Sequence, residues 1–351
     1  MRARNIDSAK AGSGGELALL REIRSRAARA GRGGLRLGIG DDCALLAPRA
    51  GEELAVTTDL SIAGRHFRLD WHPPNAVGHR ALARGLSDLA AMGARPIAAF
   101  LSLGLPRELT ESRGKQAAWV DGFLNGLLAL ADKHRVSLAG GDLAESPLAV
   151  ADIVLAGAVP RGEALLRSGA RPGDLLFVTG ALGGAAQALA RLAELAARLR
   201  PDEAQSSRPR PPHIPTKQET LLAPHLYPQP RIAQGLWLRR KGLATAAIDL
   251  SDGLSTDLGH ICEESGVAAE VDAASLPLHP GATFEQALDG GEDYELLFTA
   301  SAVARIPRSI AWVPITKIGR IVKSRRRQPA VTLLTAQGAK PLEPHGWEHF
   351  A

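Results

Sequence analysis

The sequence predicts a protein of the α/β (α+β) class with two domains, and three observations lead to this prediction. A chain of 351 residues with 45% hydrophobic and 23% charged side chains has ordinary globular composition and is long for a single core. Segments with helical and with strand-like apolar spacing alternate through both halves of the chain. The turn-forming segment Pro172-Gly173-Asp174 then starts a second series of such segments.

The first half of the chain is expected to form a complete α/β unit. In its second helix, apolar side chains recur at helical spacing and define one buried face: Val77, Ala81, Leu82, Leu86, Leu89 and Met92. We expect helices at residues 16–30, 75–92 and 111–134, and strands at residues 35–39, 54–58, 97–103, 136–139 and 148–159.

The second half repeats the alternation around one compositional break. We expect strands at residues 175–179, 245–250, 267–271 and 294–299, and helices at residues 181–199, 231–241 and 253–264. Residues 201–217 are rich in Pro, Ser, Arg and Gln and contain almost no large apolar side chain. Such composition does not support a packed core, so a flexible surface insertion is predicted at about residues 200–217.

Charge and cysteine content exclude several classes of protein. The net charge of +5 comes from basic clusters without interleaved aromatic residues, so no nucleic-acid partner is expected. Charged residues interrupt every long apolar run, and the segment 1–15 lacks the apolar part of a secretory signal, so we expect no membrane association and a cytoplasmic location. Cys43 and Cys262 are too far apart in sequence for a CxxC motif and too few for a cysteine zinc site.

Two common nucleotide-binding signatures are absent. Gly114-Lys115 lacks the upstream glycine and the following Ser or Thr of a phosphate-binding loop. The glycines of residues 180–184 join a strand to a helix but lack GxGxxG spacing, so we interpret them as a tight packing corner.

Aspartates stand at the ends of apolar strands in five short segments: GIGDD at 38–42, TTD at 57–59, SDL at 87–89, AGGD at 139–142 and DLSDG at 249–253. Each segment has a simple structural explanation on its own. Asp42 could stabilise a turn, Ser251 or Asp252 could cap the following helix, and Asp88 could pair with Arg84 one helical turn earlier.

Taken together, the acidic segments favour a metal-dependent site. Carboxylates in a partly buried cleft repel one another unless cations neutralise them. Mg²⁺ prefers carboxylate and phosphate oxygens, and the scarcity of clustered His and Cys argues against zinc. The neighbouring glycines would let backbone amides approach a phosphate closely. The pattern therefore predicts phosphoryl transfer assisted by several Mg²⁺ ions.

The same segments resemble the thiamine-monophosphate kinase family, a branch of the ATP-dependent superfamily of aminoimidazole ribonucleotide synthetase and selenophosphate synthetase. The resembling blocks are GIGDDCALL (38–46), TTDLSIAGRHF (57–67), LSDLAAMGARP (86–96), AGGD (139–142), LRSGARPGD (166–174), AIDLSDGLSTDLGHI (247–261) and GGEDYEL (290–296). LSDLAAMGA is common to the superfamily, whereas GGEDYEL and the histidine of AGRHF point to the thiamine kinase branch.

The resemblance assigns roles residue by residue. It implies Mg²⁺ ligands at Asp42, Thr57, Thr58, Asp59, Asp88, Asp142, Asp249 and Asp252. It implies nucleotide contacts at Gly141, Asp142, Arg167 and Ser251, thiamine monophosphate contacts at His66, Glu292 and Trp347, and catalytic roles for Asp59, Asp142, Arg167 and Asp252. From the residues alone, core, turn or packing roles would be preferred for the three substrate contacts.

The resemblance also implies an architecture and a reaction. An N-terminal domain at residues 1–159, with a mixed sheet, would bind ATP and Mg²⁺ and form a homodimer, and a C-terminal domain at residues 160–351 would close over the nucleotide. The reaction would be direct in-line transfer of the γ-phosphoryl group of ATP to thiamine monophosphate.

Alternatives remain open at this point. A selenophosphate synthetase would need a cysteine among residues 1–37 and a hydrogenase-maturation relative would need one at the C-terminus, and neither is present. Aminoimidazole ribonucleotide synthetase is the nearest alternative enzyme. A nucleotide-binding protein without catalysis is a second alternative, because Leu143 stands where the family often has threonine.

Overall fold

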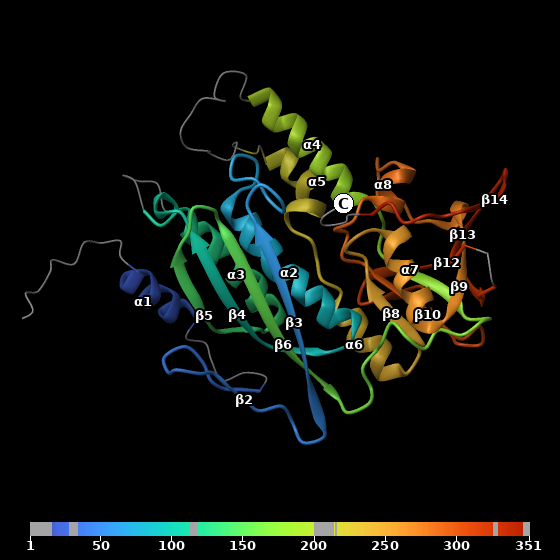
Figure 1. The fold of residues 1–351 in the computed structure, drawn as a ribbon, viewed down its shortest axis with the longest axis horizontal. Helices are drawn as coiled ribbons and strands as arrows, with labels where there is room; N and C mark the ends of the chain where they lie inside the picture. Colours follow the sequence, from blue (N-terminus) through green and yellow to red (C-terminus); the bar gives the residue numbers. More distant parts are fainter. Residues whose placement is uncertain are drawn as a thin grey trace, which may run out of the picture.

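Two large β-sheets carry the two halves of the chain (Figure 1). The computed structural model describes residues 16–27, 34–111, 118–199, 214, 216–325 and 329–346. Within these residues, the first half forms a four-stranded sheet and the second half an eight-stranded sheet. Helices pack on both sheets, so the predicted fold class is confirmed.

The four-stranded sheet has the strand order β3-β6-β4-β5, and it is mixed because β4 and β5 run parallel while the other pairs are antiparallel. Helices α2 and α3 cover one of its faces (Figure 1). Leu82, Leu86, Phe123 and Leu127 are fully buried in this layer. The elements of this half are α1 (Glu16–Ala27), β1 (Leu35–Leu37), β2 (Leu45–Leu46), β3 (Glu52–Ile62), α2 (Pro74–Ala91), β4 (Arg95–Leu105), α3 (Trp119–His134), β5 (Ser137–Glu145) and β6 (Val150–Pro160).

The eight-stranded sheet has the order β14-β13-β9-β12-β7-β10-β8, with β11 paired to β12. Only the β13–β9 pair in this sheet is parallel. The elements of this half are β7 (Leu175–Thr179), α4 (Gly184–Leu199), α5 (Thr216–Leu226), α6 (Ile232–Lys241), β8 (Ala246–Asp249), α7 (Leu254–Ser265), β9 (Val267–Asp272), α8 (Phe284–Asp289), β10 (Leu296–Ala300), β11 (Ser309–Ile310), β12 (Val313–Lys323), β13 (Val331–Thr335) and β14 (Gly338–Pro341).

The two halves share a hydrophobic core. One cluster of buried side chains joins Leu86 and Leu89 of α2 to Phe298 of β10. Helix α6 packs against α2 so closely that a Cβ atom on Gly235 would lie 1.9 Å from the carbonyl oxygen of Ala90. This packing fixes α2 at the boundary between the halves, where it forms part of the candidate site.

The expected helices and strands all have counterparts, with differences at their ends. The helix expected at 111–134 begins at Trp119, where the Asp121 side chain accepts a hydrogen bond from the Ala118 amide at 3.1 Å. Helices α5 and α8 and strands β2 and β11 to β14 were not predicted. Most of the predicted insertion at about residues 200–217 lies outside the described residues, as do residues 112–117.

No helix among the described residues is both long enough and apolar enough to cross a bilayer.

Candidate active site

A cavity of about 500 Å³ lies between β3 and the loop that follows it, α2, and two loops of the second half, which follow β8 and precede β10. Its lining includes seven of the predicted site residues, namely Asp59, His66, Asp88, Asp249, Ser251, Asp252 and Glu292. Aromatic and basic side chains complete the wall, among them Phe67, Trp71, His72, Arg84 and His225. The chain thus brings together most of the residues that the sequence analysis assigned to metal and acceptor binding.

Buried aspartates form one end of the cavity. Asp59 points from β3 toward α2, where Arg84 Nε lies 3.4 Å from its Oδ1, and the Thr57 hydroxyl donates to Asp88. The ion pair of Arg84 is therefore with Asp59, and not with Asp88 as the simple explanation of the SDL segment proposed. Burial raises the pKa of Asp59 to about 6, against the effect of Arg84 and with a contribution from the charge of Asp88.

Asp249 extends this acidic end from the last residue of β8. Asp249 is 4% exposed, and burial together with the charge of Asp88 raises the pKa of its carboxyl group well above the ordinary value. Burial likewise raises the pKa of Asp88. Burial thus disfavours the charged form of three carboxylates that lie in one place, and a bound cation would favour that form.

The acidic end fits a divalent cation. Oδ2 of Asp59 and Oδ2 of Asp249 are buried and have no hydrogen-bond partner among the described residues. Buried polar atoms normally have partners, so these two oxygens are suited to a ligand that provides positive charge. No group of three acidic, His or Cys side chains among the described residues forms a ready-made metal cage. Mg²⁺ accepts such a site, because it keeps several waters and shares its coordination with substrate phosphates.

The loop that carries Ser251 and Asp252 is held by Asp257. Asp257 Oδ2 accepts hydrogen bonds from the amides of Ser251, Asp252 and Gly253 at 3.0, 3.1 and 3.1 Å. Gly253 is the N-cap residue of α7 and makes no side-chain cap, so a helix-capping role does not explain the motif. The Asp257 side chain therefore determines how this loop faces the cavity.

The GGEDYE segment folds against the same loop. The Glu292 amide donates to the Ser251 carbonyl at 2.8 Å, and the Tyr294 amide donates to the Leu250 carbonyl at 2.9 Å. Glu292 and Tyr294 have φ of +56° and +50°, values that non-glycine residues rarely adopt. A Cβ on Gly291 would lie 2.8 Å from the Ser251 carbonyl oxygen, so glycine is required at that position.

Two further acidic residues anchor this segment outside the cavity. Asp293 accepts hydrogen bonds from the amides of Gly183 and Ala185 at 2.6 and 3.1 Å, at the start of α4. Glu295 forms an ion pair with Arg231. The unusual backbone at Glu292 is thus fixed by contacts on both sides.

His66 and Glu292 meet through an arginine that the sequence analysis did not select. Arg80 Nη2 lies 2.5 Å from Glu292 Oε1 and donates to the His66 carbonyl at 3.3 Å. The His66 ring accepts from the Ile62 amide at 3.1 Å. The sequence could have indicated Arg80, because it lies on the face of α2 that Val77 and Ala81 define as buried. A charged side chain on a buried face needs a partner.

Other predicted residues lie outside the cavity. Thr58, Asp42 and Asp142 are exposed. Side chains alternate along β3, so Thr58 faces away from Asp59 and toward the side of the sheet that α2 does not cover. Asp142 shares that outer face, since the strand register aligns it with Ser102, Asp152 and Leu60.

Gly141, Arg167 and Trp347 complete the predicted set. Gly141 has φ of +146°, and a Cβ there would lie 1.8 Å from the Leu101 carbonyl oxygen, so sheet packing alone requires glycine. Arg167 is exposed, and its charge lowers the pKa of Asp88 against the larger effect of burial. Trp347 lies outside the described residues.

The family models that match this chain define its class of protein. Residues 40–160 match the family model of the AIR synthase related protein N-terminal domain, and residues 171–304 match that of the C-terminal domain. The chain therefore has the two-part AIR synthase related fold.

Closer relatives define the branch. The chain is 39% identical to the thiamine-monophosphate kinase of Escherichia coli (strain K12), over 96% of this chain and 98% of the relative. A crystal structure of thiamine-monophosphate kinase from Stenotrophomonas maltophilia K279a superposes with a TM-score of 0.73 at 40% identity, covering 91% of this chain and 96% of that chain. A structure described as AaThiL complexed with AMPPCP and TMP gives a TM-score of 0.70 at 29% identity, covering 99% and 100%. The chain belongs to the thiamine-monophosphate kinase family, as the sequence motifs indicated.

Proposed function

We propose that this protein transfers a phosphoryl group from ATP to thiamine monophosphate and so forms ADP and thiamine diphosphate. The observation that supports this most strongly is one cavity that joins an acidic end suited to Mg²⁺ with the predicted acceptor contacts His66 and Glu292. A relative that binds both AMPPCP and TMP supports the same pair of substrates.

Several Mg²⁺ ions are part of the proposal. Asp59, Asp88, Asp249 and Asp252, with Thr57 beside them, would hold the ions inside the cavity. Bound Mg²⁺ neutralises phosphate charge and fixes the geometry of phosphoryl transfer. The Ser251 loop, held by Asp257, would bind the nucleotide next to these carboxylates.

The acceptor does not need a general base. A phosphate monoester with a second pKa of about 6 is already mostly dianionic at neutral pH, so its oxygen can attack the γ-phosphorus in line. The main obstacle is repulsion between two polyanions. Orientation by His66 and Glu292, together with charge neutralisation that includes Arg167, would lower that obstacle.

A homodimer would complete the nucleotide site. On the outer face of β3, Leu54, Val56 and Leu60 are 45%, 62% and 47% exposed, and Thr58 and Asp142 share this face. Such an apolar sheet face favours coverage by a second copy, which would bring the outer residues to a subunit boundary. Light scattering should give twice the chain mass of 36.9 kDa, whereas an active monomer would contradict the dimer.

The domain boundary near residue 159, closure of the C-terminal domain over the nucleotide and a cytoplasmic location belong to the same proposal. The first two follow from the resemblance to the family.

The reaction is tested by direct product analysis. Purified protein is incubated with ATP, Mg²⁺ and thiamine monophosphate, and ADP and thiamine diphosphate are quantified by chromatography. Free thiamine and aminoimidazole precursors serve as control acceptors. We expect stoichiometric, Mg²⁺-dependent thiamine diphosphate only with thiamine monophosphate. ATP binding without this product would show that the acceptor assignment is wrong.

A further inference from the structure

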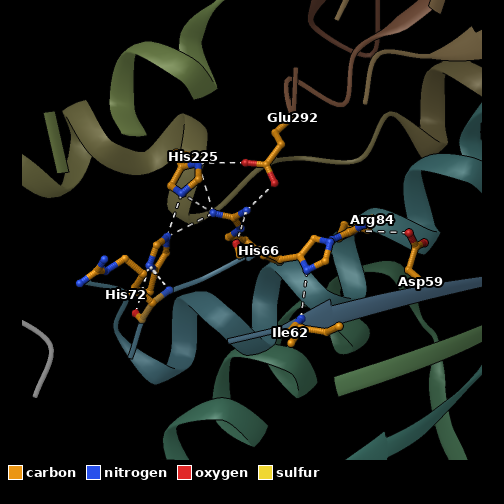
Figure 2. A network of polar contacts seen from close by, with 9 residues as sticks. Asp59, Ile62, His66, His72, Arg84, His225 and Glu292 are labelled. Atoms are coloured by element: carbon orange, nitrogen blue, oxygen red, sulfur yellow. Dashed lines mark hydrogen bonds and ion pairs between the residues drawn. The ribbon is translucent and has the colours of Figure 1, made fainter. Parts of the chain in front are cut away.

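Arg80 is a buried cation that contacts both predicted acceptor residues. Its side chain is 6% exposed and extends from the buried face of α2 to His66 and Glu292, which line the cavity. One nitrogen, Nη2, binds Glu292 Oε1 at 2.5 Å and the carbonyl of His66 at 3.3 Å (Figure 2). A single guanidinium therefore links two segments that are more than 200 residues apart, with a sequence separation of 212 between Arg80 and Glu292.

Two buried histidines hold the other side of this group. Arg80 Nη1 contacts the ring of His225, from the last turn of α5, and His225 Nε2 lies 2.9 Å from His72 Nε2. Burial and the charge of Arg80 lower the pKa of His225 to about 4 and that of His72 to about 2. Both rings are therefore neutral at ordinary pH, so each has one donor and one acceptor nitrogen.

The polar contacts of the two rings form a continuous network. His72 Nδ1 lies 3.1 Å from the Arg68 amide nitrogen and 3.2 Å from the Arg68 carbonyl oxygen. His72 Nε2 lies 2.9 Å from His225 Nε2, and His225 Nδ1 lies 3.3 Å from Glu292 Oε2. The network thus runs from His72 through His225 to the Glu292 carboxylate (Figure 2).

This arrangement fixes Glu292 as a charged group. Burial alone would raise the pKa of Glu292, but Arg80 and His225 hold it well below its usual range. Each carboxylate oxygen has a protein partner on one side, while the Glu292 side chain remains 30% exposed toward the cavity. The carboxylate is therefore oriented before any ligand arrives.

We propose that Arg80, oriented by His225 and His72, is a positioning residue that holds Glu292 and His66 against the thiamine part of thiamine monophosphate. Arg80 thereby sets the affinity of the site for thiamine monophosphate and leaves the affinity for ATP unchanged. The proposal rests on the proposed function. In Figure 2, His225 and Glu292 lie apart from the pair of Arg84 and Asp59, so the loss of Arg80 acts on the acceptor end.

The test measures kcat and KM for each substrate in Arg80→Gln, Arg80→Lys and His225→Phe, with calorimetric binding of thiamine monophosphate as a readout that needs no turnover. Arg80→Gln should raise KM for thiamine monophosphate by roughly ten- to hundredfold, the loss typical of residues that support a binding shell. KM for ATP should change by less than about threefold. Arg80→Lys should raise KM for thiamine monophosphate less, because the ammonium group keeps the positive charge but cannot donate to Glu292 and His225 from the two sides of a planar guanidinium.

Arg95→Gln is the matched control, since Arg95 also pairs with a partly buried glutamate, Glu52 at 2.8 Å, but does not line the cavity. This control should leave both KM values unchanged. Equal increases in the two KM values, or an unchanged KM for thiamine monophosphate in Arg80→Gln and His225→Phe, would overturn the proposal. If circular dichroism shows that Arg80→Gln does not fold, the test rests on His225→Phe. In that variant we expect KM for thiamine monophosphate to rise a few fold. The proposed function is judged separately, by wild-type product formation.

Discussion

Replacement of Asp257 by alanine should strongly destabilise the second half of the chain. Asp257 is 2% exposed, and its Oδ2 is the common acceptor for the amides of Ser251, Asp252 and Gly253. Alanine would leave three amides without this partner at the start of α7. Unpaired buried amides keep their full desolvation cost, so the loss exceeds that of an ordinary surface hydrogen bond.

The expected size follows from these contacts. A hydrogen bond to an ionised acceptor contributes about 1.5–3 kcal/mol. The three bonds share one oxygen, and burial with the charge of Asp252 raises the pKa of Asp257 to about 7, which offsets part of the gain. We expect Asp257→Ala to lower the free energy of unfolding by about 3–5 kcal/mol, because three amides lose their acceptor and each unsatisfied buried amide costs about 1–3 kcal/mol. Asp257→Asn keeps an acceptor oxygen and should lose only about 1 kcal/mol.

Urea unfolding followed by circular dichroism measures both variants. The midpoint should fall for Asp257→Ala with an unchanged slope, because the area exposed on unfolding is the same. If the halves unfold separately, the shift belongs to the transition of the second half. A loss below about 1 kcal/mol for alanine, or equal losses for alanine and asparagine, would refute the reasoning.

Three further predictions concern pH, packing and thiol reactivity. Burial raises the pKa of Asp293 from 3.8 to about 7, so the contribution of this group to stability falls as the pH rises from about 4 to about 7. The melting temperature of Asp293→Asn should therefore rise relative to that of the wild type over this pH range. A difference in melting temperature that does not change with pH would contradict this prediction. Gly235→Ala would place a Cβ 1.9 Å from the Ala90 carbonyl oxygen, so the variant should lose about 1–3 kcal/mol, and an unchanged melting curve would argue against the α2–α6 contact. Cys43 is exposed, whereas Cys262 is 1% exposed and burial raises its pKa to about 12. A maleimide should therefore label one thiol in the folded protein and two in urea. Fast labelling of both thiols in the folded protein would contradict the buried position of Cys262.

Periodic apolar segments were predicted well, and interrupted ones were not. Helix α2 presents a regular apolar face, which its sequence spacing already defines. Helix α5 contains Pro224 within the helix and follows a polar, proline-rich segment, so its sequence argued against a helix. In β12, Ile318 and Ile321 are both buried although they are three residues apart, because a register shift between Lys317 and Gly319 breaks the alternation.

The candidate site shows the same division. Asp59, Asp249 and Asp252 belong to local motifs that the sequence analysis had grouped, and all three line the cavity. Arg80 and His225 have no motif, since their role depends on a contact between α2 and the unpredicted helix α5. Long-range partners of this kind are set by tertiary packing and leave only a weak trace in one sequence.

One aspect of the site was available from strand geometry. Thr57, Thr58 and Asp59 were predicted as a single ligand group, although neighbouring side chains of a strand point to opposite faces. In the described chain, Thr57 and Asp59 face α2 and Thr58 faces the outer side with Asp142. Side chains on opposite faces of one strand do not reach the same metal ion, so the predicted ligands divide into an inner and an outer group.

The central claim is that the buried aspartates make this cavity a metal-dependent phosphoryl-transfer site. Turnover of Asp59→Asn and Asp252→Asn with ATP, thiamine monophosphate and saturating Mg²⁺ tests it most directly, with circular dichroism to establish that each variant is folded. We predict that each substitution lowers kcat by roughly a hundredfold or more, the loss typical of removing a main electrostatic contributor. Near-normal turnover in both folded variants would contradict the account.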